Sequence, residues 1–453
     1  MEATRTARTT GANGTRWWQL VYGLIAMMAI SSPQYVWALF TKDLSRLLNA
    51  SLAEVQVTFA ILIVAQTFLS PFQGYLIDKF GPRLLLSTGA ILTALSWILA
   101  SQMTGIWGLY LTYGLLGGVG TGIIYVGVIG LMVRWFPDKR GFAVGMVAAG
   151  YGFGAILTTF AISSHIKAAG VSSTLWMFGL GIGVIGFLAA QGMRQPKPGE
   201  VATFFAKSKA PDRESPNSYR SSDMLRKPLF WLLFFMMTMM STAGLMVISQ
   251  IGAIANDLKV ADSMIFGMAA LPLALAIDRL ANGATRPFFG WVSDHIGREN
   301  TMFLAFGLEG VAMLAWMLTM HHPVLFVLLS GLVFFGWGEI FSLFPAALTD
   351  IFGTRHATTN YGFLYMSQGV GSILGGPIAA WMRESTGSWT SVLIVVIALN
   401  FLTAILALAA LKPMRRSFLE HAKSDPKAIK GATSVVAAKA PADLDPSHRA
   451  ASI

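Results

Sequence analysis

Three ionisable side chains, Asp278, Arg279 and Arg286, lie inside one strongly apolar stretch of the sequence, from about residue 264 to 292. A stretch of ~20 apolar residues is long enough to cross a lipid bilayer as a helix. Ionisable groups at membrane depth are costly and rare, and they mark functional sites by default. An arginine offers a planar fork of N–H donors that matches a carboxylate. We therefore predict that Arg286 binds an anion, with a structural ion pair as the alternative.

The position of Arg286 argues against a side chain that reaches the membrane surface. It lies eight residues before Asp294, which is ~12 Å along a helix. Asp278 and Arg279 lie near the middle of the same helix. Each could line a cavity, and Asp278 could carry a proton, but each could equally pair with a neighbouring helix. Glu339, in another apolar run, is a third candidate for proton or charge coupling.

The composition indicates a membrane protein. Of the 453 residues, 54% are hydrophobic and only 12% are charged, against about 25% charged residues in a soluble domain. The absence of cysteine excludes disulfides and thiolate metal sites. The net charge of +11 does not indicate nucleic-acid binding, because the basic residues fall between apolar runs and in the tail rather than in one patch.

Twelve apolar segments can be marked along the chain, and all are predicted to be helices, because lipid tolerates only helices or closed barrels and the alternation of strands is absent. They are 17–40, 54–77, 84–104, 106–133, 141–163, 172–193, 228–254, 264–292, 301–320, 323–349, 357–382 and 389–411. We expect an all-α membrane protein with a cytoplasmic N-terminus (1–16), a six-helix bundle (17–193), a cytoplasmic central loop (194–227), a second six-helix bundle (228–411) and a disordered cytoplasmic tail (412–453).

The basic residues between the segments predict the orientation. The connections on the N-terminal side of the membrane carry most of them, including Lys79, Arg83, Arg134, Lys139 and Arg140. An excess of lysine and arginine marks the cytoplasmic side. Both termini are therefore expected in the cytoplasm, in a multi-pass protein of a bacterial inner (plasma) membrane.

The two halves of the sequence repeat. The segment from Ser70 to Gly81 matches the segment from Arg286 to Gly297, an offset of 286 − 70 = 216 residues. Parallel repeats with a site near the midplane between them describe the major facilitator architecture. Proline, phenylalanine, glycine and aspartate recur in both segments, whereas Arg286 replaces Ser70. The arginine is therefore not part of the shared scaffold, which favours binding over packing.

Two loop motifs follow the same repeat. Gly74-x-x-x-Asp78-x-x-Gly81-x-Arg83 and Gly290-x-x-x-Asp294-x-x-Gly297-Arg298 resemble the cytoplasmic loop motif of the major facilitator superfamily. Glycine permits a tight turn and close helix approach, and aspartate can face a helix N-terminus. We expect a gating role for Asp78, Arg83, Asp294 and Arg298. Lys139 and Arg140 are interpreted as an ordinary basic turn.

More specific motifs resemble the oxalate/formate antiporter family, over residues 16 to about 412. They are Arg134-Trp135-Phe136-Pro137-Asp138-Lys139-Arg140-Gly141, Asp78-Lys79-Phe80-Gly81-Pro82-Arg83, Asn282-Gly283-x-x-Arg286-Pro287-Phe288-x-Gly290, and Asp350-Ile351-Phe352-Gly353-Thr354 through Asn360-Tyr361-Gly362-Phe363. The resemblance implies a pocket between the halves, with Arg286 as its helix-eight arginine. The other implied binding residues are Gln34, Tyr35, Tyr125, Trp337, Phe341 and Tyr365.

One position departs from that family. Its helix-eleven lysine falls on Gln368 in this sequence, and a neutral amide cannot balance a second carboxylate. The Asn282-x-x-x-Arg286 arrangement also resembles the proton-coupled monocarboxylate transporters, in which an aspartate occupies the position of Asn282. Gln368 and Asn282 are therefore both expected at the binding site.

The sequence thus predicts a secondary transporter that moves small carboxylates by alternating access, with formate, lactate or pyruvate favoured and proton coupling through Asp278 as an option. Strict oxalate:formate exchange, with Arg279 as the second positive charge, and a non-transporting carboxylate sensor are the alternatives. No nucleophile–base pair, metal cluster or nucleotide loop is visible, so we expect neither an enzyme nor a cofactor or metal. The expected partners are a small carboxylate and the lipid bilayer, not nucleic acid, and the protein is expected to be a monomer.

Overall fold

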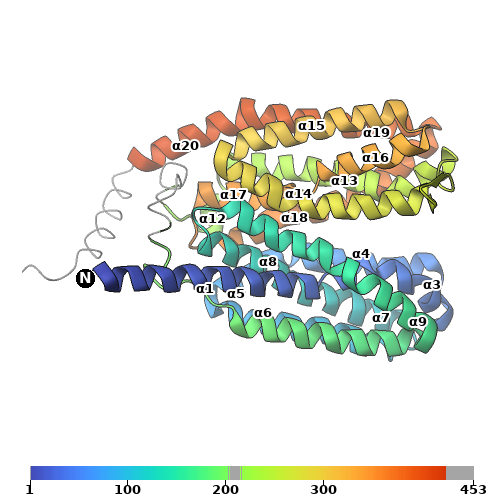
Figure 1. Cartoon of the computed structure of the whole chain (residues 1–453), viewed down its shortest axis with the longest axis horizontal. Helices are drawn as coiled ribbons and strands as arrows, with labels where there is room; N and C mark the ends of the chain where they lie inside the picture. Colours follow the sequence, from blue (N-terminus) through green and yellow to red (C-terminus); the bar gives the residue numbers. More distant parts are fainter. Residues whose placement is uncertain (1, 203, 205–214, 216, 425–453) are drawn as a thin grey trace, which may run out of the picture.

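The computed structural model describes residues 2–202, 204, 215 and 217–424 as two helical bundles that lie side by side (Figure 1). The first bundle contains α1 (Glu2–Ala29), α2 (Ser32–Tyr35), α3 (Trp37–Leu47), α4 (Leu52–Phe68), α5 (Ser70–Phe80), α6 (Pro82–Ala100), α7 (Ile106–Leu109), the π-helix η1 (Tyr110–Leu116), α8 (Gly117–Trp135) and α9 (Arg140–Gly192). After the short α12 (Ser221–Met224), the second bundle contains α13 (Pro228–Asp257), β1 (Met264–Ile265), β2 (Met268–Ala269), α14 (Ala270–Ile296), α15 (Arg298–Thr319), α16 (Pro323–Phe335), α17 (Ile340–Phe352), α18 (Ala357–Thr386), α19 (Trp389–Leu406), the π-helix η2 (Ala407–Leu411) and α20 (Lys412–Ser424).

The helices account for twelve membrane spans in the described chain. Nine segments are long and apolar enough to cross a membrane when two bent helix pairs are each taken as one span. The longest, α9, breaks at Gly170, where φ is +80°, and therefore forms two spans. The helices α14 and α18 have 27 and 30 residues and are long enough to span, although they are more polar. The predicted all-α architecture with two six-helix halves is confirmed.

The repeat in the sequence is also a repeat in the backbone. Gly81 ends α5 with φ +89°, and Gly297 ends α14 with φ +96°. Such φ values favour glycine because a Cβ is strained there. Asp78 and Asp294 each lie three residues before the turn, so the two carboxylates occupy equivalent positions in the two halves.

The two bundles pack closely at one end, where α5, α9, α14 and α17 finish; we call this the loop end. It lies on the side of α12 in Figure 1. There α14 crosses α9, and α5 crosses α18. A Cβ at Gly290 would collide with the carbonyl oxygen of Gly141, and a Cβ at Gly74 would lie 2.5 Å from that of Thr358. The helices therefore meet backbone to backbone across the two halves.

One predicted helix begins later than expected. Met264–Ala269 forms a two-stranded antiparallel hairpin in which Ile265 pairs with Met268, and α14 begins only at Ala270. The two residues between the strands, Phe266 and Gly267, have φ of 49° and 81°. Two-residue hairpin loops favour such positive φ angles, so a local turn replaces the first helical turns of the apolar run.

The prediction of a disordered tail is wrong for its first part. Residues Lys412–Ser424 form α20, which continues α19 through η2. Arg415 Nη1 donates to Glu299 Oε1 at 2.6 Å, and both side chains are buried. This ion pair fastens α20 to the start of α15. Residues 425–453 of the tail lie outside the described residues, as do 203, 205–214 and 216 of the predicted central loop.

Candidate functional site

A small cavity of about 90 Å³ lies between the two bundles. Pockets for drug-sized ligands measure ~300–1,000 Å³, so this one suits a ligand of a few heavy atoms. Arg286 is the one charged residue among those that line it. The lining comprises Gln34, Tyr35, Ile63, Gln66, Thr67, Tyr125 and Tyr151 from the first half and Leu245, Ile248, Arg286, Trp337, Phe341, Tyr365 and Gln368 from the second.

The Arg286 side chain is held only by neutral groups. Its residue is 1% exposed. Nη1 donates to the carbonyl oxygen of Ala148 on α9 at 2.7 Å, and Nη2 donates to Asn282 Oδ1 at 2.9 Å. The guanidinium carbon lies 4.7 Å from the centre of the Phe341 ring. Nε has no hydrogen-bond partner, and no ion pair to Arg286 occurs among the described residues. A buried charge without a counter-charge is costly, so the site is complementary to an anion.

Asn282 has a different place from the one predicted. It is not among the residues that line the cavity. It lies one helical turn before Arg286 on α14, and residues four apart on a helix are neighbours. Its Oδ1 accepts the hydrogen bond from Nη2. Asn282 therefore orients the arginine rather than facing the ligand.

Hydrogen-bonded aromatic groups form the wall from the first half. The Tyr151 hydroxyl donates to Gln34 Oε1 at 2.5 Å and accepts from Gln66 Nε2 at 3.3 Å. The rings of Tyr125 and Tyr365 stack across the two halves, with centroids 4.8 Å apart. Aromatic pairs in this range stabilise by about 0.5–1.5 kcal/mol beyond their burial. The cavity wall is thus a rigid, polar-edged surface that spans both bundles.

The second half contributes an anchored aromatic corner and an amide. Trp337 Nε1 donates to the carbonyl oxygen of Met240 at 2.9 Å, and its ring meets Phe341 edge-on at 5.8 Å. Gln368 lines the cavity from α18, and its Oε1 has no hydrogen-bond partner. The structure therefore brings together eight of the nine residues predicted to bind substrate, all except Asn282.

The three candidates for proton or charge coupling do not line the cavity. Asp278 is buried and faces α16, where a Cβ at Gly331 would lie 4.0 Å from its Oδ1. Arg279 is exposed. Adjacent helical residues point in different directions, which separates this pair. The suggestion that Arg279 supplies a second positive charge to the site is therefore wrong.

Glu339 lies within the second bundle together with another carboxylate. Glu339 and Glu309 are both buried, and all four of their carboxylate oxygens lack hydrogen-bond partners among the described residues. No hydrogen bond or ion pair joins Glu339 to Arg286 among the described residues. Glu339 is a neighbour of the site rather than part of its lining.

The sequence reading missed several lining residues, of which Gln66, Thr67 and Tyr151 are polar. Gln66 and Thr67 interrupt the apolar run 54–77, and a polar residue inside a membrane helix is a signal that could have identified them. The sequence does not distinguish Tyr151 in this way, because an aromatic side chain in an apolar helix usually packs against neighbouring helices. The role of the Tyr151 hydroxyl follows from its hydrogen bonds to Gln34 and Gln66, which lie on two other helices.

At the loop end, each motif aspartate binds the start of a helix in the opposite half. Asp294 accepts from the backbone N–H groups of Gly141 (3.0 Å) and Phe142 (2.9 Å) at the beginning of α9. Asp78 accepts from the backbone N–H (3.0 Å) and hydroxyl (2.6 Å) of Thr359 in the first turn of α18. These N–H groups have no partner within their own helix. A carboxylate there also interacts favourably with the helix dipole.

Arginines complete these contacts, but not all of the expected ones. Arg134 forms an ion pair with Asp78, and Arg298 Nη1 donates to Asp294 Oδ1 at 2.6 Å. Arg83 is exposed and takes no part, so its expected place in the network is wrong. The turn residue Arg140 is 1% exposed.

The buried Arg140 corrects the interpretation of an ordinary basic turn. Its Nη1 donates to Asp350 Oδ1 at 2.7 Å, and Arg298 Nε donates to Asp350 Oδ2 at 3.0 Å. Asp350 therefore joins an arginine of each half. Because Arg140 and Asp350 are 210 positions apart, no local pattern indicates the pair.

Comparison with protein families decides the identity of this two-bundle chain. The model of the Major Facilitator Superfamily matches residues 20–280 and 235–442, and together these matches extend over most of the sequence. The chain belongs to the major facilitator superfamily.

Within the superfamily, the chain belongs to the family of the oxalate:formate antiporter of Oxalobacter formigenes. The two are 33% identical over 429 residues, which cover 94% of this chain and 99% of that protein. Monocarboxylate transporter 13 of Bos taurus is 26% identical over 83% of this chain and 82% of its own length. The family recognised from the loop and helix-eight motifs is confirmed.

Solved structures show the same fold at low identity. The proton:xylose symporter XylE superposes with a TM-score of 0.67 at 12% identity and covers 88% of this chain and 96% of its own. The fucose:proton symporter FucP of E. coli has a TM-score of 0.63 at 15% identity, with coverage of 86% and 98%. This superfamily member is therefore an integral, multi-pass membrane protein with the two-bundle transporter fold.

Proposed function

We propose that this superfamily member carries a small carboxylate anion across the membrane by alternating access, with Arg286 binding the carboxylate. One observation carries the proposal: a buried guanidinium with only neutral partners lies in a cavity between the two halves. The relatives named for oxalate, formate and monocarboxylates support the substrate class. Binding and release between two bundles require no bond-breaking chemistry, so we assign no enzymatic reaction.

The charge of the cavity favours monocarboxylates over dicarboxylates. Gln368 lines the cavity as a neutral amide, and Arg279 is exposed outside it. One positive charge balances one carboxylate, as in formate, lactate or pyruvate. A second carboxylate would be desolvated without a counter-charge, which costs several kcal/mol in a buried site. Strict oxalate:formate exchange is therefore the second candidate, favoured only by the identity to the Oxalobacter protein.

The loop-end contacts supply a gate for alternating access in this proposal. Asp78 and Asp294 each hold the start of a helix in the opposite half, and Asp350 joins Arg140 to Arg298. We propose that these contacts break when the cavity opens at the loop end. We further propose a monomer with both termini and the loop end in the cytoplasm, on the basis of the excess of basic residues in the connections at that end.

Proton coupling would act indirectly in this arrangement. Asp278 faces α16 rather than the cavity, so a proton on its carboxylate would not contact the substrate. This keeps proton coupling as an option to be measured together with substrate choice.

Counterflow in proteoliposomes tests the proposal. Vesicles that contain the full-length protein and unlabelled carboxylate would be given labelled formate, lactate, pyruvate or oxalate at two pH values. We expect accumulation of at least one labelled monocarboxylate and weaker accumulation of oxalate. Counterflow with none of these anions would contradict the transport function, and carboxylate binding without counterflow would establish the sensor alternative. Counterflow rates that do not change when a pH gradient is imposed would exclude proton coupling.

A further inference from the structure

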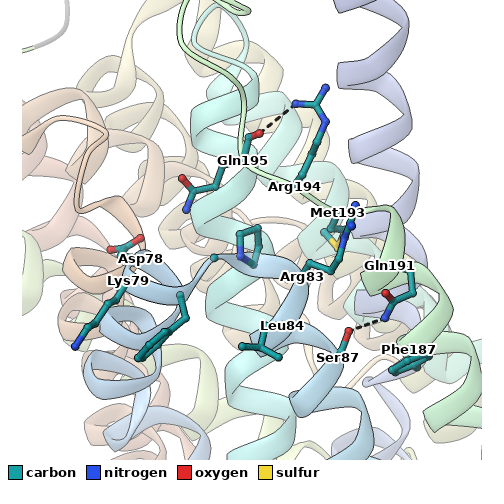
Figure 2. A pocket seen from close by; sticks show the side chains of 13 residues that line it. Asp78, Lys79, Arg83, Leu84, Ser87, Phe187, Gln191, Met193, Arg194 and Gln195 are labelled. Carbon is teal, nitrogen blue, oxygen red and sulfur yellow. Dashed lines mark hydrogen bonds between the residues drawn. The ribbon is translucent and has the colours of Figure 1, made fainter.

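A second, larger cavity lies at the loop end of the first bundle, outside the central cavity, and Figure 2 shows its lining. Its volume is about 850 Å³. The α5–α6 turn, the last turns of α9 and residues 193–195 line it, and it is open to the surface. None of the residues that bind Arg286 or line the central cavity takes part, so the function of this cavity is separate from substrate binding.

Arg83 is an available positive charge in this cavity. It is exposed, and no hydrogen bond or ion pair of its guanidinium occurs within the described part of the chain. Two other charges are already matched: Arg194 Nη2 donates to Glu200 Oε1 at 2.7 Å, and Asp78 pairs with Arg134. Lys79 also lines the cavity; its ammonium lies 5.2 Å from the centre of the Phe80 ring. The Arg194 guanidinium also holds the pKa of Glu200 below its ordinary value. An anion that entered the cavity would therefore meet Arg83 without a competing carboxylate.

Neutral polar groups and an aromatic ring lie on the same side of the cavity as Arg83. Gln191 Nε2 donates to Ser87 Oγ at 2.9 Å, and Figure 2 shows this pair between Arg83 and Phe187. Lys79 extends on the opposite side of Leu84 in that view. The polar groups thus give way to an apolar surface at Phe187.

Phe187 also lines an apolar groove of about 270 Å³ between α6 and the second part of α9. Leu95 of α6 lines this groove eleven residues after Leu84, which lines the polar cavity. Eleven residues correspond to ~16 Å along a helix, about half of the ~30 Å hydrocarbon thickness of a bilayer. The polar cavity and the groove together therefore extend from the loop-end surface to about the middle of the membrane, the depth of one lipid leaflet, and the groove itself lies along α6 from Ile91 to Leu95.

Small residues at the helix crossing and larger exposed ones around it shape the groove. A Cβ at Gly183 would collide with the Cβ of Ala94, so the two helices pack closely there. Ile91, Val184 and Leu188 line the groove and are 46%, 50% and 63% exposed. Exposed apolar side chains around a close crossing form a furrow that fits a hydrocarbon chain.

We propose that this cavity and groove together bind one anionic phospholipid from the membrane leaflet at the loop end. Arg83 holds the phosphate, and Ser87 and Gln191 contact the polar oxygens of the headgroup and glycerol. One acyl chain lies in the groove beyond Phe187. Basic pockets between membrane helices on the cytoplasmic side suit anionic headgroups, and the apolar groove, which shares Phe187 with the polar cavity, distinguishes a lipid from a soluble phosphate.

Native mass spectrometry of the purified full-length protein with added phosphatidylglycerol or phosphatidylcholine tests the site. We expect a phosphatidylglycerol complex that is weakened about fivefold by Arg83→Gln and preserved by Arg83→Lys. The matched control is Arg226→Gln, which removes another exposed arginine at the loop end, outside the cavity and groove. Its complex should match that of the unaltered protein.

Three results would overturn the lipid site. The first is a phosphatidylglycerol complex that is as strong in Arg83→Gln as in the unaltered protein. The second is a complex weakened equally by Arg226→Gln, which would indicate general charge attraction. The third is binding of phosphatidylcholine by the unaltered protein as strong as that of phosphatidylglycerol. A separate arm adds glycerol 3-phosphate as competitor. Weak competition supports a role for the acyl chain, whereas competition as strong as that of phosphatidylglycerol would show a soluble phosphate site instead.

Discussion

The Arg286 guanidinium is surrounded by groups that interact with it without forming an ion pair among the described residues. A backbone carbonyl, an amide oxygen and the face of an aromatic ring each direct negative partial charge towards the guanidinium. Interactions of this kind are stronger in a medium of low polarity than in water. They fix the orientation of the fork without an ion pair among the described residues, which is the property that a carboxylate site requires.

The charge of the cavity can be changed at a single residue. Gln368→Lys would add a second cation to the lining opposite a ligand held by Arg286. We expect oxalate counterflow to increase relative to formate counterflow by about tenfold, since one charge-assisted hydrogen bond contributes about 1.5–3 kcal/mol. Competition between labelled oxalate and formate in proteoliposomes measures the ratio.

The control for Gln368→Lys is Gln368→Met, which removes the amide without adding charge. Its oxalate-to-formate ratio should not rise. An unchanged ratio in Gln368→Lys, with the protein folded and inserted, would mean that the substrate does not contact this face of α18.

At the scale of the element, the start of α9 depends on a carboxylate from the other half. The backbone N–H groups of Gly141 and Phe142 are bound by Asp294, and α9 lies against α14 along the interface. Because Asp294 belongs to α14, the same contact stabilises a helix start and closes the loop end. When the loop end opens, these N–H groups must lose their hydrogen bonds to Asp294 and form hydrogen bonds with water instead.

Asp294→Asn should therefore favour the open loop end. The loss of a charge-assisted contact of ~1.5–3 kcal/mol corresponds to a shift of about tenfold or more in the closed-to-open equilibrium. Since the chain has no cysteine, a Ser70→Cys background gives a single reporter thiol at a buried position of the interface. Its rate of labelling by a polar thiol reagent should rise about tenfold in Asp294→Asn.

Asp257→Asn is the matched control for this labelling. Asp257 binds Arg383 (2.9 Å) and Trp389 (2.8 Å) within the second bundle, and among the described residues it has no hydrogen bond or ion pair to the first half. Its substitution should leave the labelling rate of Ser70→Cys unchanged. Equal rates in Asp294→Asn and Asp257→Asn would show that the α9 start does not control the interface.

At the scale of the whole molecule, the duplicated halves give two equivalent gates. Asp78 binds the start of α18, and Asp294 binds the start of α9. The two contacts share no residue, so their effects on the closed-to-open equilibrium should add in free energy. In the Ser70→Cys background, the double variant Asp78→Asn/Asp294→Asn should show a fold increase in labelling rate about equal to the product of the two single-variant increases. A double variant no faster than either single variant would instead indicate one cooperative latch.

The same duplication explains how much the sequence could predict. Apolar runs and the 216-residue offset define twelve helices in two halves, and the contrast between Ser70 and Arg286 separates binding from scaffold. Motif resemblance places the aromatic residues of the cavity. These signals are local or periodic, so they can be read without coordinates.

What the sequence could not predict depends on contacts between distant segments. Arg140 has the pattern of a solvated turn, and only the fold brings Asp350 to it. Arg279 and Asp278 are adjacent in sequence, yet one is exposed and the other buried, because the packing of α14 against its neighbours decides which side faces the protein. Tyr151 gains its role only from partners on two other helices.

The central claim, that Arg286 binds the transported carboxylate, is tested most directly by monocarboxylate counterflow in proteoliposomes that contain Arg286→Gln or Arg286→Lys. We expect Arg286→Gln to reduce the rate at least tenfold, because the carboxylate loses its charged partner. Arg286→Lys should retain partial activity, since it keeps the charge but not the planar fork. Full counterflow by a correctly inserted Arg286→Gln protein would contradict the account.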